Sequence, residues 1–272
     1  MNELQRRNIP VYSVSSIFRK EQIFFRWYGK SYRKVLNTFT HLFVQDEASV
    51  QLLRTISITN TTVVGDTRFD RVLEICRQAK ELPLVEKFKG NHTAFVAGSS
   101  WGPDEDIFIP YLNAHPEVKL IIAPHVIDES HLKEITSKLN RTIVRYTQAT
   151  EEKVKEADCL LIDCFGLLSS IYRYGEIAYI GGGFGVGIHN VLEAAVYGMP
   201  VIFGPNNKRF REAQGLLQCK GGFEIQGAED FKKIMDNFLN NYEALDKAGK
   251  KAGNYVRDNA GALEKIMHTV TL

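Results

Sequence analysis

The sequence has few of the features that mark secreted or membrane-spanning proteins. No apolar run approaches the roughly 18 residues that a membrane span requires, and the first residues, MNELQRR, lack the apolar core of a signal peptide. A chain of 272 residues does not need disulfides for stability, and its four cysteines form neither a CxxC pair nor a metal-ligand spacing. We therefore expect a cytoplasmic protein with reduced thiols at Cys76, Cys159, Cys164 and Cys219.

The net charge is small, and motifs that bind metals are missing from the sequence. Because 34 lysines and arginines stand against 32 aspartates and glutamates, nucleic acid is disfavoured as a partner of the whole chain. The sequence contains no HExxH and no clustered set of His and Asp that would bind a metal. No serine or cysteine nucleophile stands at a readable spacing from His189. We therefore expect no metal and no cofactor, and hydrolase functions are disfavoured.

Short β-branched runs alternate with longer segments of helical period, which is typical of α/β units around a mostly parallel sheet. Strands are predicted at residues 10–14, 41–44, 61–64, 93–97, 118–123, 142–145, 159–162, 177–180, 201–203 and 223–225. Helices are predicted at residues 104–113, 128–139, 167–174, 191–197 and 228–238.

A change in composition over residues 71–89 predicts a domain boundary. Only about three strands precede it, too few to form a sheet with both faces covered. We interpret residues 1–73 as the C-terminal part of one α/β domain and residues 74–90 as linker helices. Residues 91–241 form a regular α/β domain with a parallel sheet, and residues 242–272 are predicted C-terminal helices that pack back on the first block.

The strongest functional signal is the glycine-rich segment 181–187, which follows a predicted strand and leads into a predicted helix. Five glycines in seven residues let the backbone approach a ligand closely, and the N–H groups at a helix start suit a phosphate. Glu193 shares a helix face with Asn190, where its carboxylate can accept hydrogen bonds from a ribose diol. The alternative is a simple turn in which Asn190 and Glu193 cap the helix.

Three more loops follow predicted strands. Ser99 and Ser100 either contact a phosphate or only start the next helix. His125 follows Pro124 at a strand end, although a lone histidine is more often structural, and a turn at 163–167 ends another strand. Because the carboxyl ends of parallel strands meet at one edge of a sheet, we expect these loops and the glycine-rich segment to form one site.

Residues 18–34 differ in kind, because they combine aromatic residues with six cations and a single acid. As a helix, this segment would place its cations beside Phe24, Trp27, Tyr28 and Tyr32. That composition suits an anionic membrane surface or a phosphorylated glycolipid. The alternative is an amphipathic helix that buries its aromatic residues and exposes its cations. The cations are Arg19, Lys20, Arg26, Lys30, Arg33 and Lys34.

These segments together resemble the bacterial 3-deoxy-D-manno-octulosonic acid (Kdo) transferases. Six segments, taken in order, resemble the C-terminal domain of that family. They are the serine loop at Ser99, Pro124–His125, Phe165–Gly166, Gly182–Gly183, the run HNVLEAA at 189–195 and the run GMPVIFGP at 198–205. Upstream, the runs NIPV at 8–11, VQDE at 44–47 and GDTRFD at 65–70 are similar to N-terminal segments of the same family.

The resemblance implies a GT-B glycosyltransferase that transfers Kdo from CMP-Kdo to a lipid A precursor in lipopolysaccharide biosynthesis. It implies a peripheral protein on the cytoplasmic face of the bacterial inner membrane, with residues 91–241 as the donor-binding domain and the cations of 18–34 on the acceptor and membrane side. The implied nucleotide contacts are Pro124, His125, Phe165, Gly166, Leu167, Asn190, Val191, Leu192 and Glu193. The implied phosphate contacts are Ser99, Ser100, Gly183 and His189.

Two positions depart from the family. His125 stands in place of arginine, which removes a permanent cation, and Leu167 stands in place of glutamate. The family's general base, a glutamate, lies upstream of this chain, so no catalytic residue is assigned and we expect CMP binding with weak or no transfer. Two alternatives remain: a GT-B enzyme or epimerase that uses a UDP-sugar, and a non-catalytic nucleotide- or lipid-binding module.

Overall fold

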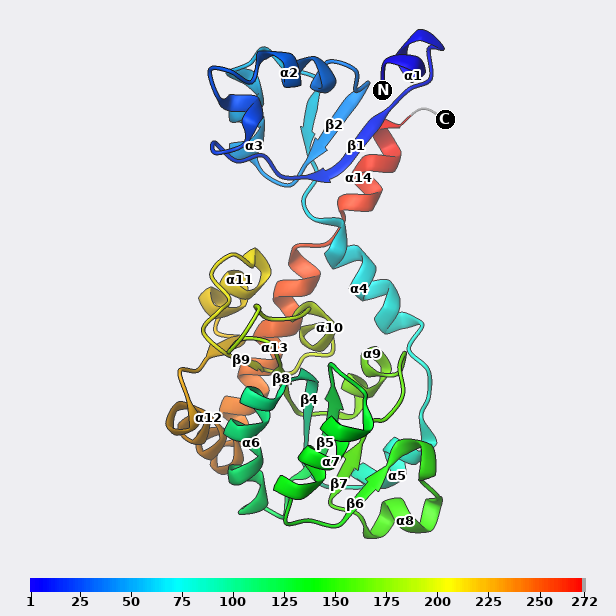
Figure 1. Ribbon diagram of the computed structural model, residues 1–272, viewed down its shortest axis with the longest axis vertical. Helices are drawn as coiled ribbons and strands as arrows, with labels where there is room; N and C mark the ends of the chain where they lie inside the picture. Colours follow the sequence, from blue (N-terminus) through cyan, green and yellow to red (C-terminus); the bar gives the residue numbers. More distant parts are fainter. Residues whose placement is uncertain (271–272) are drawn as a thin grey trace. The chain divides into compact units, whose positions relative to one another are not determined.

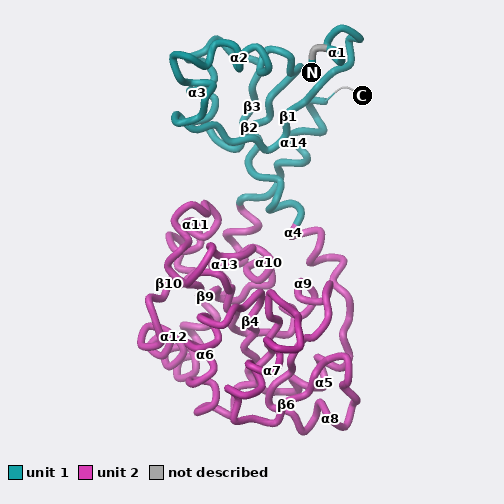
Figure 2. Tube along the Cα trace, in the orientation of Figure 1, with its two compact units in different colours: residues 1–71, 259–272 teal, residues 72–258 magenta. Residues whose placement is uncertain are grey.

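The computed structural model describes residues 1–270, which divide into two compact units (Figure 1). Unit 1 comprises residues 1–71 and the chain from Asn259 onward, and unit 2 comprises residues 72–258 (Figure 2). Each unit is built on its own parallel sheet. All ten predicted strands are present, so the predicted α/β class is confirmed.

Unit 1 has a three-stranded sheet whose central strand separates two small cores. Along β2, Leu42 and Val44 join a cluster that α2 and α3 complete. Phe43 points to the opposite face, as the two-residue period of a strand requires, and packs with Ile266 of α14. In the order β1-β2-β3 the strands are β1 (Tyr12–Ser16), β2 (His41–Val44) and β3 (Thr61–Val63); the helices are α1 (Asn2–Arg6), α2 (Lys30–Leu36), α3 (Glu47–Arg54) and α14 (Ala262–Thr269).

The C-terminal helices divide between the units. The helix α13 (Tyr242–Asp258) packs against α10, α11 and α12 of unit 2, whereas α14 lies beside the sheet of unit 1 (Figure 1). The carboxylate of Asp70 caps α14 by accepting hydrogen bonds from the amides of Gly261 and Ala262, at 2.8 and 3.1 Å. The predicted return to the first block therefore applies to α14, while the apolar face of α13 is buried in unit 2.

The predicted linker 74–90 also has defined partners. It contains the end of α4 (Thr67–Arg77) and the whole of α5 (Pro83–Lys89). The helix α5 buries Val85 and Phe88 and packs against α8, so it is part of unit 2.

Unit 2 has a seven-stranded parallel sheet in the order β10-β9-β8-β4-β5-β7-β6. The strands β5 and β8 flank β4 on opposite sides, so the strand order reverses at β4. In open α/β sheets the crevice at such a switch point, at the carboxyl ends of the strands, is where ligands bind. The strands are β4 (Ala94–Ser100), β5 (Lys119–Pro124), β6 (Ile143–Arg145), β7 (Cys159–Leu161), β8 (Ile177–Ile180), β9 (Val201–Phe203) and β10 (Gly222–Glu224).

Helices cover both faces of this sheet, and an aromatic cluster holds its centre. Phe95 of β4 lies 5.7 Å from the rings of both Phe108 and Phe231, and Tyr179 of β8 lies 5.3 Å from Phe108. These rings are almost fully buried, which makes the centre of the sheet a rigid support for the strand ends. The helices not yet bounded are α6 (Gly102–Asn113), α7 (Glu129–Lys138), α8 (Glu151–Glu156), α9 (Leu168–Ile171), α10 (Leu192–Ala195), α11 (Arg211–Cys219) and α12 (Ala228–Asn240).

The basic segment 18–34 is not one helix, which corrects the prediction. It contains a short 3-10 turn, η1 (Ile23–Phe25), and α2 begins only at Lys30. The cause is a close turn at Gly29, where a Cβ atom would lie 1.8 Å from the carbonyl oxygen of Ile23. Phe24 packs against the unit 1 core. No helix within residues 1–270 is long and apolar enough to cross a membrane.

Candidate functional site

The four predicted loops follow four adjacent strands of unit 2, β8, β4, β5 and β7, so their positions at one edge of the sheet are as predicted. Backbone hydrogen bonds join the ends of β8, β4 and β5 directly. Gly181 donates to the carbonyl oxygen of Gly98 at 3.0 Å, and His125 donates to that of Ser100 at 2.9 Å. The loops therefore form one continuous rim at the carboxyl ends of the strands.

The end of β4 is bulged, and its two serines have different roles. The pairing with β5 shifts register between Gly98 and Ser100, and Ser99 adopts a left-handed backbone conformation with φ of +52°. Ser100 is fully buried and its hydroxyl donates to Glu105 at 2.8 Å. Because that hydroxyl is engaged inside the fold, only Ser99 remains as a candidate phosphate contact of the predicted pair.

Ser100 also stands in a GxSxG pattern, GSSWG at 98–102, on a strand-to-helix turn. In hydrolases with this motif the serine oxygen is exposed and bonded to a base. Here the oxygen is buried and donates to a carboxylate. The pattern therefore does not build a nucleophile.

A buried carboxylate and a histidine fix the loop after β5. Glu105 of α6 is fully buried and lies 3.0 Å from Nε2 of His131, whose Nδ1 lies 2.9 Å from the carbonyl oxygen of Val126. Burial raises the pKa of Glu105. Burial alone would lower the pKa of His131, but the bond to Val126 and the carboxylate outweigh it, so that the pKa is raised.

Asp104 joins α6 to the glycine-rich loop. Its buried carboxylate accepts hydrogen bonds from the Tyr179 hydroxyl at 2.9 Å, the Gly182 amide at 2.9 Å and the Trp101 amide at 3.0 Å. Burial raises its pKa although three donors act in the opposite direction. One side chain thus ties together the ends of β4 and β8. No sequence pattern singled out Asp104, Glu105 or His131 as site residues, and the only available signal was the pair of acids at a helix start.

Most amides of the glycine-rich loop bind within the protein. The amides of Gly185 and Gly187 both donate to the carbonyl oxygen of Gly182, and that of His189 donates to Gly181. Among the described residues of this loop and the one after it, the amides of Gly183, Phe184, Val186 and Ile188 have no acceptor. The helix that follows shortens to one turn, Leu192–Ala195, which is shorter than predicted and aligns few peptide dipoles.

Asn190 and Glu193 contact each other at the start of the helix, as expected if they only cap it. Asn190 Nδ2 donates to Glu193 Oε1 at 2.9 Å, and Asn190 Oδ1 accepts from the amide of Leu192 at 3.2 Å. Within residues 1–270, Oε2 of Glu193 accepts no hydrogen bond, and the side chain is half-buried. The pair is therefore ordered while one carboxylate oxygen stays open to a ligand. Val191 and Leu192, which the resemblance also implies as nucleotide contacts, are buried.

Three rings meet at the centre of the rim. His125 stacks on both Trp101 and His189, with ring centroids 4.6 and 4.3 Å apart, and Trp101 Nε1 donates to His189 Nε2 at 3.3 Å. Burial, and next the charge of His125, lower the pKa of His189. Pro124 ends β5 directly beside this group.

The turn after β7 is the most open part of the rim. Phe165 is 79% exposed and Gly166 has φ of +84°, and Leu167 is half-buried. Asp163 is occupied, because its carboxylate accepts from the amide and hydroxyl of Thr147. Phe165 therefore offers a free aromatic face to a ligand.

A small pocket of about 130 Å³ lies at the rim, between the glycine-rich loop and the start of α6. It is lined by Trp101, Pro103, Asp104, Gly182, Phe184, Gly185 and Val186. Ligand sites typically measure about 300–1,000 Å³. This pocket can thus hold only one corner of a nucleotide-sugar.

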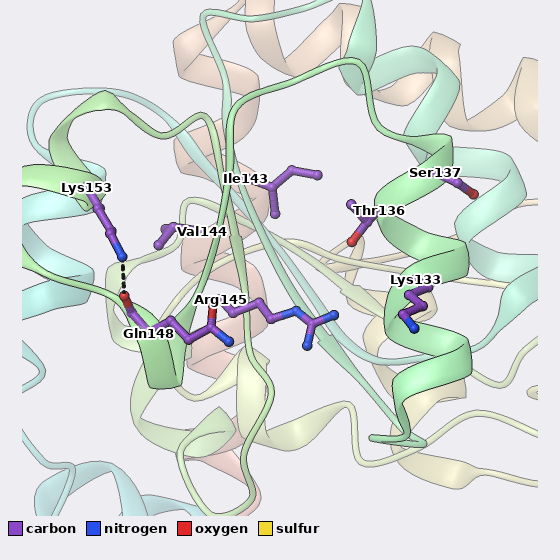
Figure 3. A pocket seen from close by; sticks show the side chains of 8 residues that line it. All are labelled: Lys133, Thr136, Ser137, Ile143, Val144, Arg145, Gln148 and Lys153. Atoms are coloured by element: carbon purple, nitrogen blue, oxygen red, sulfur yellow. Dashed lines mark hydrogen bonds between the residues drawn. The ribbon is translucent and has the colours of Figure 1, made fainter.

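A larger cavity of about 500 Å³ lies away from the rim, between α7 and the edge strand β6 (Figure 3). None of the predicted site residues lines it. Two of its three cations are engaged: Arg145 binds Glu129 at 2.8 Å, and Lys153 donates to the carbonyl oxygen of Gln148. The cavity therefore carries little free charge, and the rim remains the better candidate site.

The cations of the basic segment lie in unit 1 and differ in availability. Arg33 donates to the carbonyl oxygens of Phe24 and Arg26, at 2.7 and 3.0 Å, so it braces the turn before α2. Arg26 donates to the carbonyl oxygen of Glu21. Beside them, Trp27 is 90% exposed. The exposed side chains here include Trp27, Tyr28, Tyr32 and Val35 with Arg19, Lys20, Lys30 and Lys34, and we call this set the basic-aromatic patch.

Comparison with known proteins confirms the resemblance seen in the sequence. Residues 1–71 match the family model described as 3-deoxy-D-manno-octulosonic-acid transferase (kdotransferase). Over 248 residues the chain is 26% identical to the 3-deoxy-D-manno-octulosonic acid transferase of Rickettsia bellii, which covers 88% of this chain and 59% of that protein. The chain thus spans about half to three fifths of the length of such relatives.

Solved structures confirm the predicted GT-B-type fold. The C-terminal CMP-Kdo binding domain of WaaA from Acinetobacter baumannii superimposes with a TM-score of 0.55 at 20% identity, covering 70% of this chain and 97% of that one. The UDP-GlcNAc 2-epimerase from Neisseria meningitidis bound to UDP-GlcNAc gives 0.63 at 15% identity, covering 96% of this chain and 71% of that one. At these identities the likeness shows the fold alone.

The close approach of the loops predicts a strong effect of Gly181→Ala. A Cβ atom at Gly181 would lie 2.2 Å from the carbonyl oxygen of Ser99, so β4 and β8 must separate, which we expect to cost about 2 kcal/mol or more. The control is Gly185→Ala, whose Cβ meets nothing closer than 3.9 Å and should change stability by less than about 0.5 kcal/mol. Urea unfolding measures the stability of both variants, and equal effects would contradict the close approach of β4 and β8 at Gly181.

The three donors on Asp104 predict that Asp104→Asn destabilises unit 2. An amide retains one acceptor oxygen and turns an NH₂ group toward N–H and O–H donors, so we expect a loss of about 2 kcal/mol in unfolding free energy. Asp106→Asn is the matched control two residues away, where a 64% exposed carboxylate pairs with Lys138 and contributes about 0–1 kcal/mol. Similar losses in both variants by denaturant titration would refute the role of Asp104.

Proposed function

We propose that this chain, a relative of the Kdo transferases by sequence, provides the donor-binding part of a glycosyltransferase that transfers Kdo from CMP-Kdo in lipopolysaccharide synthesis. The observation that carries the proposal is the rim of unit 2, where four loops converge at the switch point of a parallel sheet. The likeness of that fold to a CMP-Kdo binding domain supports it.

The nucleoside would be held by side chains that the fold leaves open. The second carboxylate oxygen of Glu193 suits a ribose diol, because Asn190 already orients the group. The exposed ring of Phe165 and the outer face of His125 offer flat surfaces for a pyrimidine. The replacement of the family's arginine by His125 then exchanges a planar cation for a stacking ring.

The phosphate would lie against the glycine-rich loop. Within residues 1–270, the amides of Gly183, Phe184 and Val186, Nδ1 of His189 and the hydroxyl of Ser99 donate no hydrogen bond, and Phe184 and Val186 line the small pocket at the rim. Donors fixed in this way stabilise the negative charge that develops on a departing CMP, with no metal or cofactor assigned to the step.

The acceptor side is assigned to the basic-aromatic patch of unit 1. Exposed Trp27 and Tyr28 beside Lys30 and Lys34 suit the interface of an anionic membrane, and the cations suit the phosphates of a lipid A precursor. This assigns the protein a peripheral place on the cytoplasmic face of the inner membrane.

A UDP-sugar enzyme or epimerase is the second candidate, favoured by the fold likeness to a UDP-GlcNAc 2-epimerase over 96% of the chain. The nucleotide base separates the two functions. A non-catalytic nucleotide-binding module would share the site, and transfer of Kdo from CMP-Kdo to a lipid A precursor separates it from an enzyme.

The donor site predicts that CMP binds best among CMP, UDP and GDP in a thermal-shift panel, because a ligand that binds only the native state raises the midpoint. In calorimetry, Glu193→Gln should weaken CMP about tenfold through the loss of a charged acceptor. Glu243→Gln, an exposed glutamate of α13, is the control and should leave binding unchanged. Tighter binding of UDP would favour the second candidate, and no binding would reject both.

The basic-aromatic patch predicts sedimentation with vesicles of phosphatidylglycerol and phosphatidylethanolamine. Reversing Lys30 and Lys34 to Glu should weaken binding at least about 30-fold, because each lost cation contributes about 1 kcal/mol near an anionic surface and the new carboxylates add repulsion. Lys155→Glu with Lys247→Glu makes the same change in net charge on exposed residues of unit 2 and is the control. Equal losses in the two double variants would show that net charge alone drives binding.

A further inference from the structure

Trp101, His125 and His189 form a three-ring unit whose geometry determines which ring nitrogen of His189 carries the proton. The rings come from the loops after β4, β5 and β8, which are the three strands at the switch point. His125 stacks at 4.6 Å on Trp101 and at 4.3 Å on His189, with interplanar angles of 26° in both contacts.

The indole and the His189 imidazole lie edge to edge on the same face of His125. Two rings on opposite faces of a third would be about 7 Å apart, twice the van der Waals separation. Trp101 Nε1 and His189 Nε2 are only 3.3 Å apart. His125 therefore covers the junction between the two rings and shields their hydrogen bond on that side.

This hydrogen bond selects a tautomer. An indole nitrogen only donates, so Nε2 of His189 must be the acceptor and carries no proton. A neutral imidazole then has its proton on Nδ1. Among the described residues the only buried side-chain nitrogen or oxygen without a partner is Nε of Arg141, and no acceptor binds Nδ1 of His189, so Nδ1–H is open to solvent at the rim.

The surroundings of His189 favour its neutral form. Burial, and next the charge of His125, lower its pKa, and four charged side chains of the same loops and of the elements beside them have partners of their own. Asp104 binds Trp101, Tyr179 and Gly182; Glu105 binds Ser100 and His131; Arg209 donates to the carbonyl oxygen of Val186; Glu193 binds Asn190.

We propose that Trp101 is a positioning residue that holds His189 in the Nδ1–H tautomer, so that the glycine-rich loop presents a neutral N–H donor to the phosphate of the bound nucleotide. The identity of the ligand in this inference rests on the proposed function. The tautomer of His189 does not, because the ring geometry sets it in the free protein. Protonation of His189 places a second N–H against the indole N–H and breaks the bond.

The first measurement needs no ligand. Long-range ¹H–¹⁵N correlation spectra of the ¹⁵N-labelled full chain at pH 8 report which nitrogen of each histidine carries the proton, and His189→Asn identifies the signals of His189. We expect Nδ1–H in the wild type and a shift toward Nε2–H in Trp101→Phe. The control is Trp27→Phe, at the exposed tryptophan of unit 1, which should leave His189 unchanged. An Nε2–H wild type, or a Trp101→Phe spectrum identical to the wild type, overturns the proposal.

The second measurement is CMP affinity by calorimetry at pH 8, where a histidine of lowered pKa is neutral. Trp101→Phe should weaken CMP about tenfold, the lower end of the effect of losing one hydrogen bond to a charged group. Asparagine places its amide nitrogen close to the position of Nδ1. His189→Asn should therefore retain most of the affinity for CMP. In that background, Trp101→Phe should cause no further loss. His189→Gln, whose amide nitrogen does not reach the position of Nδ1, should lose the affinity. Independent, additive losses in the double variants overturn the proposal.

Thermal midpoints of the variants show whether each one is folded, and His189→Asn tests the donor without changing the stacked tryptophan. If wild-type protein binds no CMP, the proposed function fails, while the spectra still decide whether Trp101 sets the proton of His189. If CMP binds but the spectra show Nε2–H, the proposed function stands and the positioning role fails.

Discussion

The rim of unit 2 depends on the carboxylate of Asp104. Its two oxygens hold the start of α6, the hydroxyl of Tyr179 on β8 and the amide of Gly182, so one buried group sets the spacing between the strands at the switch point. A buried carboxylate is stable only when it is well hydrogen-bonded. The same bonds fix the indole of Trp101 relative to the glycine-rich loop, and the ring unit with His125 and His189 follows from that placement.

Most strands of unit 2 were predictable because they are short, buried, apolar runs, and the central strands of a parallel sheet are buried on both faces. The failures have local causes that spacing does not reveal. The segment at 18–34 has helical composition, but Gly29 lies against the Ile23 carbonyl and the helix starts after it. The helix after the glycine-rich loop stops after one turn, close to Gly198 with φ of +77°.

The convergence of four loops was predictable from topology, since strand ends of a parallel sheet share an edge. The supporting groups were not. Glu105 lies 26 positions from His131 in the sequence, and Asp104 lies 78 positions from Gly182, so no motif records either contact. Ser100 is the converse case, because its residue type and position suggested either a ligand contact or a helix start, and only the structure shows that its hydroxyl binds Glu105 inside the fold.

The capping of α14 by Asp70 has a consequence for how the protein is made. Ala262 and Ile266, which pack on Phe43 and Val64, are synthesised about two hundred residues after them. Until then α14 cannot cover its face of the three-stranded sheet. The seven-stranded unit can complete its own core before that moment, so this contact of the three-stranded sheet forms after the larger unit has been synthesised.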